Sequence, residues 1–391
     1  MHSSKRFIPR TSWVVGIVGL ALFLVSAGGG VAPAGAQEAV FDRSKANVEA
    51  VVSTPYFTLN KVTVDGSPPL EETIINGPPK PPAGYEGQRA PVDVETARGR
   101  TSSNVLTVPA FNWVFGCSSV SGAMIAGFYD RNGYANIYTG PTNGGVMPLD
   151  NSSWPTWSDG YETYPNLPLA ASHMGVDGRT TKGSIDDYWI RYNSTASDPY
   201  ITGGWTQHTW SDAIGDYMKT SQSAFSNSDG STRFWNWISS DRMTCDDMAS
   251  GGYVDDGTYG RKLFYEARGY SVGDCYNQKT DNRVSGGFTF AQFKAEIDAG
   301  RPVMINITGH TIVGVGYDDS TNTVYLNDTW DYNTHSMTWG GSYSGMEMQS
   351  VSIVNLTSSP SPTPPTPPTP PTPTSSAATP SLLYLLSGGG Q

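Results

Sequence analysis

The sequence predicts an α+β fold in which a helix packs on an antiparallel sheet. Few segments have helical periodicity, and the clearest of them is followed at once by short apolar strands. This helix is predicted over residues 290–299, because Thr289 and Gln292 can form a capping box and Gly300 can end the helix. Strands are predicted at residues 56–64, 303–307, 311–316 and 323–326.

A second helix is expected to begin near Cys117 and to end at Asp130–Gly133. Val120, Met124 and Phe128 recur every four residues and would form its core face. Small residues between them would let a sheet approach the helix closely.

The composition divides the chain into five segments. Residues 1–36 have a basic start, a short apolar run and an Ala-x-Ala pattern, which together are typical of an export signal peptide. Residues 37–105 are polar with Pro-rich patches and are either a pro-region or strands added to the main domain. Residues 106–357 are the expected folded domain. A Pro/Thr-rich linker follows over 358–380, and a short apolar and Gly-rich tail over 381–391.

Charge and export signal limit the partners. The formal charge is −11, and an acidic surface repels phosphate backbones, so we expect no nucleic-acid partner. The signal predicts a secreted, extracellular protein. No second long apolar stretch follows it, so no membrane span is expected after signal removal. Two interpretations of the tail stay open: it associates with the cell surface, or it has no role.

The three cysteines are expected to differ in state. In an oxidising compartment Cys245 and Cys275, both in turn-rich surroundings, would form a possible disulfide and leave Cys117 free. The sequence has no Cys-x-x-Cys and no His-x-x-x-His spacing of the kind that forms structural zinc sites. We expect no metal and no cofactor.

Cys117 is predicted at the N-terminus of its helix. There the unpaired backbone N–H groups and the helix dipole favour the thiolate, which is the form needed for nucleophilic acyl transfer. The alternative is an inert core thiol, since free cysteines are often buried. The local pattern favours neither.

His310 is the best candidate for the partner of a reactive thiol, because it opens a predicted hairpin. A three-residue loop centred on Asp319 would place His310 opposite Asp328, whose carboxylate could then orient the imidazole. A two- or four-residue loop would instead bring Asn327 or Thr329 to that position. Three other histidines are less promising: His173 and His208 lie in the long stretch before His310, and His335 is expected in an exposed loop.

Three stretches carry a resemblance to a known family: Phe111–Asp130, Phe290–Pro302 and His310–Trp330. Together they resemble the papain-like cysteine peptidases of the C thirty-nine-like family, and most closely the secreted relatives of the double-glycine bacteriocin leader peptidases. The order Cys, His, Asp matches, and so does the stretch AEIDAGRPVMINITGHTIVGVGYDD. The resemblance covers about half of the main domain.

The resemblance implies a papain-like fold and assigns roles to residues. Cys117 would be the nucleophile, His310 the general base and acid, and Asp328 the orienting residue, with Asn327 as the alternative third member. The family places a Gln before the Cys as oxyanion donor, whereas this chain offers Asn112, five residues upstream. The long stretch between the Cys and the His is a second departure from compact members.

The resemblance thus predicts a secreted hydrolase that cleaves peptide or protein substrates through an acyl-enzyme. Two alternatives stay open: a cell-wall amidase or transpeptidase on the same scaffold, and an inactive, surface-displayed binding module.

Overall fold

The computed structural model describes residues 41–84, 88–114, 116–135, 137–138, 145–154, 156–158, 163–165, 167, 169–170, 213–221, 225–227 and 230–357. The predicted signal peptide, linker and tail, together with His173 and His208, lie outside the described residues. Within the described residues, no helix has the length and apolar character needed to cross a membrane.

The larger sheet has nine strands among the described residues, and all of its pairings are antiparallel. Its main path runs β13 (Thr334–Thr338), β12 (Thr323–Asn327), β11 (His310–Asp318), β10 (Val303–Ile307), β15 (Met346–Leu356), β9 (Val272–Lys279) and β8 (Met243–Thr244). In addition, β4 (Ser103–Val105) pairs with β11, and β14 (Ser342–Tyr343) pairs with β15.

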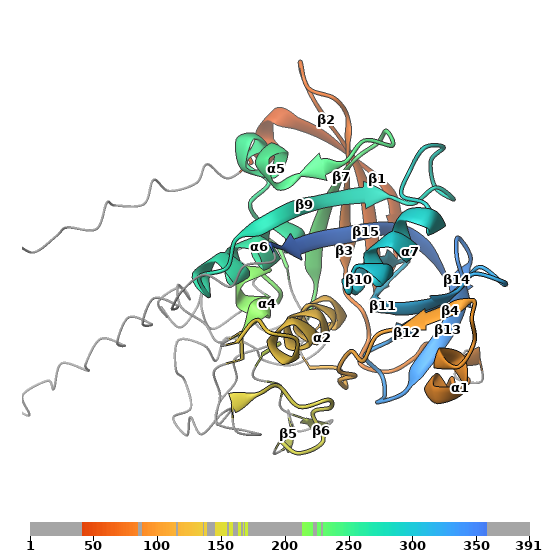
Figure 1. Cartoon of the computed structure of the whole chain (residues 1–391). Coiled ribbons are helices and arrows are strands. Elements are labelled where there is room, and N and C mark those ends of the chain that lie inside the picture. The colour runs from red at the N-terminus through yellow and green to blue at the C-terminus, as the bar shows by residue number, and fades with distance from the viewer. Residues whose placement is uncertain are drawn as a thin grey trace, which may run out of the picture. The chain divides into compact units, whose positions relative to one another are not determined.

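A second sheet brings the N-terminal segment onto the main domain (Figure 1). Its order is β1 (Ala46–Ser53), β2 (Phe57–Val64), β3 (Leu70–Ile75) and β7 (Thr232–Trp237). The strand predicted at 56–64 is confirmed as β2. Segment 37–105 thus supplies three strands of this sheet, and Leu70 and Ile75 are fully buried. A small ribbon pairs β5 (Thr156–Ser158) with β6 (Thr163–Pro165).

The helices are few and short. Those within the described part of the chain are η1 (Arg43–Lys45), α1 (Val94–Arg98), α2 (Cys117–Arg131), α4 (Ile214–Tyr217), α5 (Cys245–Gly251), α6 (Gly257–Ala267) and α7 (Phe290–Asp298). Both predicted helices are confirmed, as α2 and α7, and the Thr289–Gln292 capping box of α7 is present. The α+β class with antiparallel sheets is therefore correct, and it is compatible with a papain-like fold.

Helix α2 is buried along its length, not on one face only: every residue except Arg131 is buried. On one side, the Ser121 hydroxyl donates to the Thr311 carbonyl of β11 at 3.1 Å. On the other, Gly122 packs against Met218, just after α4. The sequence suggested that the small residues of α2 face the sheet. In the structure they also let the α4 region pack closely against the helix.

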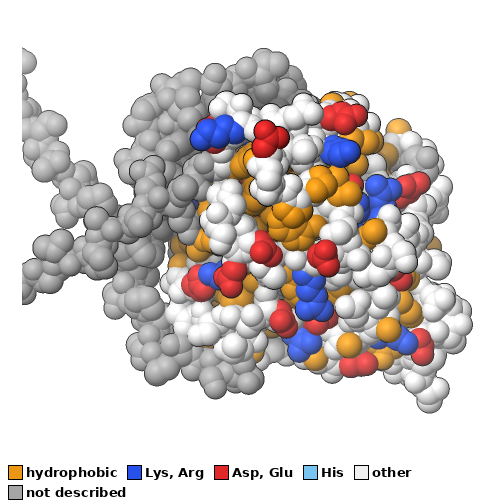
Figure 2. Space-filling model, turned by 90° about the horizontal axis from the view of Figure 1, so that it is seen from above, with side chains coloured by type: hydrophobic (Ala, Val, Ile, Leu, Met, Phe, Trp, Pro, Cys, Tyr) orange, Lys and Arg blue, Asp and Glu red, His pale blue; other side chains and the backbone are white. Residues whose placement is uncertain are grey.

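The structure joins Cys245, the first residue of α5, to Cys275 of β9 in a disulfide, and leaves Cys117 as a free thiol. This bridge ties a short helix to the larger sheet. On the face shown in Figure 2, acidic, basic and apolar side chains of the described residues are interspersed.

Candidate active site

A glycine turn sets the start of the helix that carries Cys117. Gly116 has φ +132°, which disfavours residues with a side chain. A Cβ at this position would also overlap the Gly230 carbonyl oxygen and come within 2.8 Å of Thr220 Cγ2. The backbone therefore turns sharply, and Cys117 becomes the first residue of α2.

Cys117 and His310 lie together in the interior, although 193 positions of chain separate them. His310 is the first residue of β11, directly after Gly309, whose φ of +94° forms the tight connection from β10. Both side chains face Gly77: a Cβ built on Gly77 would overlap Cys117 Sγ and lie 2.5 Å from His310 Nδ1. The imidazole Nδ1 is thus the ring atom on the side of the thiol.

The surroundings of Cys117 favour the thiolate. Burial of the thiol, the largest single effect, would raise its pKa. The charge of His310 and a hydrogen bond from it, with help from the Thr311 backbone and the Ser118 hydroxyl, outweigh burial and lower the pKa below the ordinary 9.0. Ser118 is in turn held by the Thr311 hydroxyl at 2.8 Å.

His310 is fixed through its other ring nitrogen. Nε2 lies 2.7 Å from the main-chain carbonyl oxygen of Asp328 and 3.3 Å from Thr329 Oγ1. A carbonyl only accepts hydrogen bonds, so Nε2 carries the proton in the neutral ring. Nδ1 then has its lone pair available on the side of Cys117. Trp330 stacks on the imidazole, with ring centroids 4.0 Å apart.

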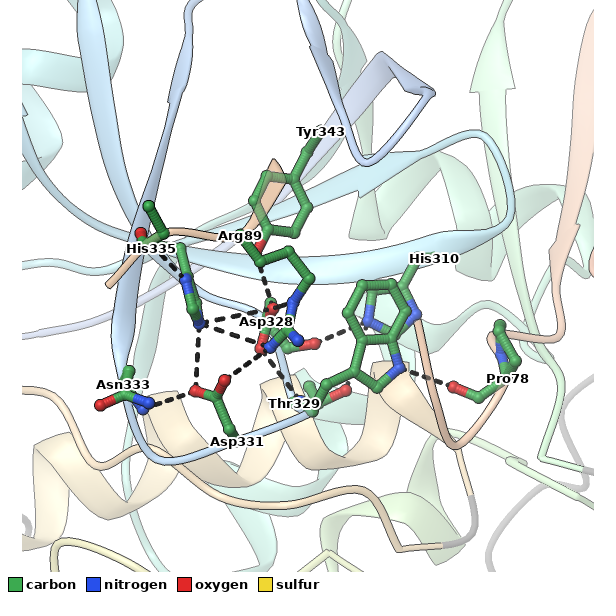
Figure 3. Close-up of polar contacts among 11 residues, drawn as sticks. Pro78, Arg89, His310, Asp328, Thr329, Asp331, Asn333, His335 and Tyr343 are labelled. Atoms are coloured by element: carbon green, nitrogen blue, oxygen red, sulfur yellow. Dashed lines mark hydrogen bonds and ion pairs between the residues drawn. The ribbon is translucent and has the colours of Figure 1, made fainter. Parts of the chain in front are cut away.

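The carboxylate of Asp328 points away from His310 (Figure 3). It accepts from Arg89 Nε and from the Tyr343 hydroxyl, both at 2.6 Å, and from the Trp330 backbone N–H at 3.0 Å. The expected contact between this carboxylate and the imidazole of His310 therefore does not form. Asp328 reaches His310 through its peptide group instead.

The hairpin register explains this difference. β11 and β12 pair Asp318 with Thr323, which leaves a four-residue connection, and a bulge lies between Gly314 and Gly316. The ladder ends where Val313 faces Asn327. The predicted direct pairing of His310 with Asp328 is wrong for this reason, since the three-residue loop does not form. Thr329, one of the two residues that a different loop length would bring, does contact the ring.

The other two predicted polar residues have different partners. Asn327 donates from its side-chain amide to the Pro109 carbonyl at 3.1 Å and accepts from Thr334 Oγ1 at 3.0 Å, so it holds the irregular segment before α2. Asn112 pairs through its backbone with the side chain of Asn151. No described contact joins either amide to Cys117 or His310.

Arg89 and His335 are functional candidates that the sequence reasoning missed. Arg89 bridges Asp328 and Asp331 from a position 239 residues upstream of Asp328, so no local pattern could reveal it. His335 is 1% exposed on β13, not in an exposed loop, and its Nε2 lies 3.0 Å from Asp331 Oδ1.

The charges in this cluster support one another. Burial would lower the pKa of His335, but the hydrogen bond with Asp331 and the charges of Asp328 and Asp331 outweigh it and raise the pKa above 6.5. Burial opposes ionisation of Asp331 as well, yet its hydrogen bond with His335 contributes to a pKa of about 2.

Asp328, Asp331 and His335 also bring three potential metal ligands within 4.8 Å of one another. The guanidinium of Arg89 contacts both carboxylates and lies 3.4 Å from His335 Nε2. Because this cation already compensates the two acids, the group fits an ion-pair network better than a metal centre.

In a comparison with known proteins, part of the chain is similar to one family. Residues 231–350 match the profile of the Peptidase_C39 like family. The matched region contains His310, Asp328 and most of the larger sheet, and begins after Cys117. No curated protein and no solved structure matches the chain. The match supports a C39-like, papain-like peptidase family.

Proposed function

We propose that this C39-like chain is a cysteine peptidase that hydrolyses peptide bonds with Cys117 as nucleophile and His310 as general base and acid. The single observation that supports this most is the packing of Cys117 Sγ and His310 Nδ1 around Gly77. A thiol beside an imidazole whose other nitrogen is fixed is the arrangement required for an activated nucleophile.

The proposed reaction uses the tautomer that the Asp328 carbonyl selects. His310 Nδ1 takes the proton of Cys117, and the thiolate attacks the substrate carbonyl carbon. The imidazolium then gives this proton to the leaving amine as the C–N bond breaks, which leaves a thioester on Cys117. A water molecule, deprotonated by His310, attacks the thioester and releases the acid and the free thiol.

The first oxyanion donor in this proposal is the backbone N–H of Cys117 at the start of α2, where no side chain caps the helix. The side-chain amide of Asn112, which the sequence suggested, would be a second donor.

Arg89 and Asp328 act as positioning residues in this proposal. Arg89 holds the Asp328 carboxylate and also lies over the Trp330 ring, 5.4 Å from its centroid. Asp328 contacts the imidazole of His310 through its carbonyl, and Trp330 stacks on the same ring. A displaced Arg89 would therefore loosen both the carbonyl that fixes Nε2 and the ring that stacks on His310.

Activity assays of purified wild-type chain against Cys117→Ala and Cys117→Ser test the function directly. Wild type should release fluorescent amine from peptide amides, whereas both variants should lose at least ~10³-fold of kcat/KM. Circular dichroism and an intact Cys245–Cys275 bridge control for the fold. Equal activity of all three proteins would exclude Cys117 as nucleophile.

Two other functions use the same residues. A cell-wall amidase or transpeptidase would act on peptidoglycan fragments in preference to linear peptides. An inactive binding module would leave every amide intact, and its Cys117 would react with iodoacetamide only after unfolding. Secretion, and cell-surface association through the C-terminal tail, are further proposals that fractionation of an expressing cell would test.

A further inference from the structure

A short piece of the chain itself covers the thiol. After β3 ends at Ile75, residues Asn76–Pro79, which we term the strap, run past Cys117 and His310. Gly77 and Pro78 are buried, and Cys117 and His310 are both 0% exposed. The space at the thiol leaves no room for a side chain at Gly77, because its Cβ would overlap Sγ.

Two indole groups hold the strap by its main chain. Trp113 Nε1 donates to the Gly77 carbonyl at 3.1 Å, and Trp330 Nε1 donates to the Pro78 carbonyl at 2.8 Å. Trp113 precedes the nucleophile by four residues, and Trp330 stacks on His310. Figure 3 shows Pro78 beside His310. Two successive carbonyls thus accept from donors on two separate segments of the chain, as the backbone of a bound peptide would.

The strap has few main-chain donors, and the Asn76 N–H already donates to the Tyr56 carbonyl oxygen at 2.9 Å. It belongs to no strand, and Pro78 and Pro79 have no N–H group to donate. Lys80, which follows it, is exposed. On its N-terminal side the strap continues from β3, whose Ile75 pairs with both Phe57 and Thr232 and is fixed in the sheet. One end is therefore anchored and the other leads to the surface, so the strap can be displaced without loss of β3.

We propose that Asn76–Pro79 is an autoinhibitory occupant of a peptide groove, and that this groove binds peptide main chain through the indole N–H groups of Trp113 and Trp330. Substrate must displace the strap, or a cut on the exposed side of the strap must release it. The bond after Gly77 joins it to the nitrogen of Pro78. If the strap were cleaved at this bond, the leaving residue would be a proline, which has no N–H group. The role of the groove rests on the proposed function, whereas the covering of the thiol does not.

Substitution at Gly77 tests the proposal without reference to catalysis. In Gly77→Ala the new methyl group must push the strap off Cys117, so the thiol should react with iodoacetamide at least ~10-fold faster than in wild type. Gly99→Ala is the matched control, because Gly99 has φ −71° and its nearest contact would be an ordinary 3.5 Å. An unchanged labelling rate in a folded Gly77→Ala variant overturns the proposal.

A second variant covers the case in which Gly77→Ala does not fold. A recognition sequence for a site-specific protease is inserted in the full chain after Lys80, and labelling and peptidase activity are measured before and after cutting. A rise in both supports the strap and the peptidase. A rise in labelling alone supports the strap and contradicts the proposed function. No rise in labelling overturns the strap, whatever the activity.

Discussion

His310 and Asp328 interact through a main-chain carbonyl: the imidazole Nε2 lies 2.7 Å from the Asp328 carbonyl oxygen, while the carboxylate bonds to Arg89 and Tyr343. A carbonyl fixes the ring tautomer but carries no full charge to stabilise an imidazolium. The buried acid therefore orients the histidine through the chain that it anchors, and the ion pair with Arg89 becomes part of the geometry of the site.

Removal of one partner of the Arg89–Asp328 ion pair should lower the stability of the folded chain. The Asp328 side chain is fully buried and that of Arg89 is 10% exposed, so Asp328→Asn leaves a buried guanidinium with only Asp331 to compensate it. We expect a loss of ~3 kcal/mol in the free energy of unfolding. The carbonyl remains in the Asn variant, so kcat/KM should fall less than in His310→Ala. Urea denaturation and peptide assays measure the two effects.

The double variant Asp328→Asn/Arg89→Met provides the control. It removes the uncompensated cation, so its loss of stability should be clearly smaller than the sum of the two single losses. Additive losses would mean that the two side chains are not energetically coupled.

The pKa of Cys117 should depend on His310. The lowered pKa of the thiol means that its alkylation rate rises with pH around a midpoint below 9.0 in wild type. In His310→Ala the charge and the hydrogen bond are lost while burial remains, so the midpoint should move upward. The pH dependence of iodoacetamide labelling measures this midpoint. An unchanged midpoint would mean that His310 does not influence the pKa of Cys117.

His335 should make the stability of the protein depend on pH. Its pKa is raised in the folded chain, so the folded state binds the proton more tightly than the unfolded state. This contribution is fully present below about pH 6.5 and is lost as pH rises through the raised pKa. Relative to His335→Gln, wild type should therefore gain most at acidic pH. Urea unfolding from pH 5 to 9 checks this, and a constant difference would contradict it.

The disulfide should contribute substantially to stability. It closes a loop with a sequence separation of 30, for which chain entropy gives ~3–4 kcal/mol. Cys245→Ala/Cys275→Ala should lose about this amount in urea denaturation, as should wild type in a reductant. Cys117 labelling at native conditions should change little, because the bridge joins α5 to β9 and not to α2.

Local elements were predictable because their signals are local. The capping box before α7, the alternation in β2 and the apolar runs of β10 and β11 involve residues within a few positions of one another, and these elements form close to the expected bounds. Helix α6 was not predicted. It begins with Gly257 and contains Gly260, which lower helix propensity, and both glycines are needed for packing against Phe234 and Tyr217.

The site was predictable only in part, since its remaining contacts depend on tertiary structure. The sequence indicated Cys117 and His310 as candidates, and the structure brings them together at Gly77. The orientation of Asp328 depends on a bulge and a four-residue turn, and neither Gly314 nor Asn322 signals these by itself. Arg89 and Gly77 come from a segment whose role sequence alone left open between a pro-region and added strands.

The pairing of β3 with β7 has a consequence for biosynthesis. Leu70 of β3 pairs with Trp237 of β7. The edge of β3 that faces β7 therefore has no partner until the ribosome has made Trp237. At ribosomal speeds this wait lasts on the order of ten to thirty seconds. During it the nascent chain exposes an unsatisfied apolar strand edge, which attracts chaperones and neighbouring chains alike. The yield of correctly folded protein should therefore respond to elongation rate and chaperone supply more than to the stability of the finished molecule.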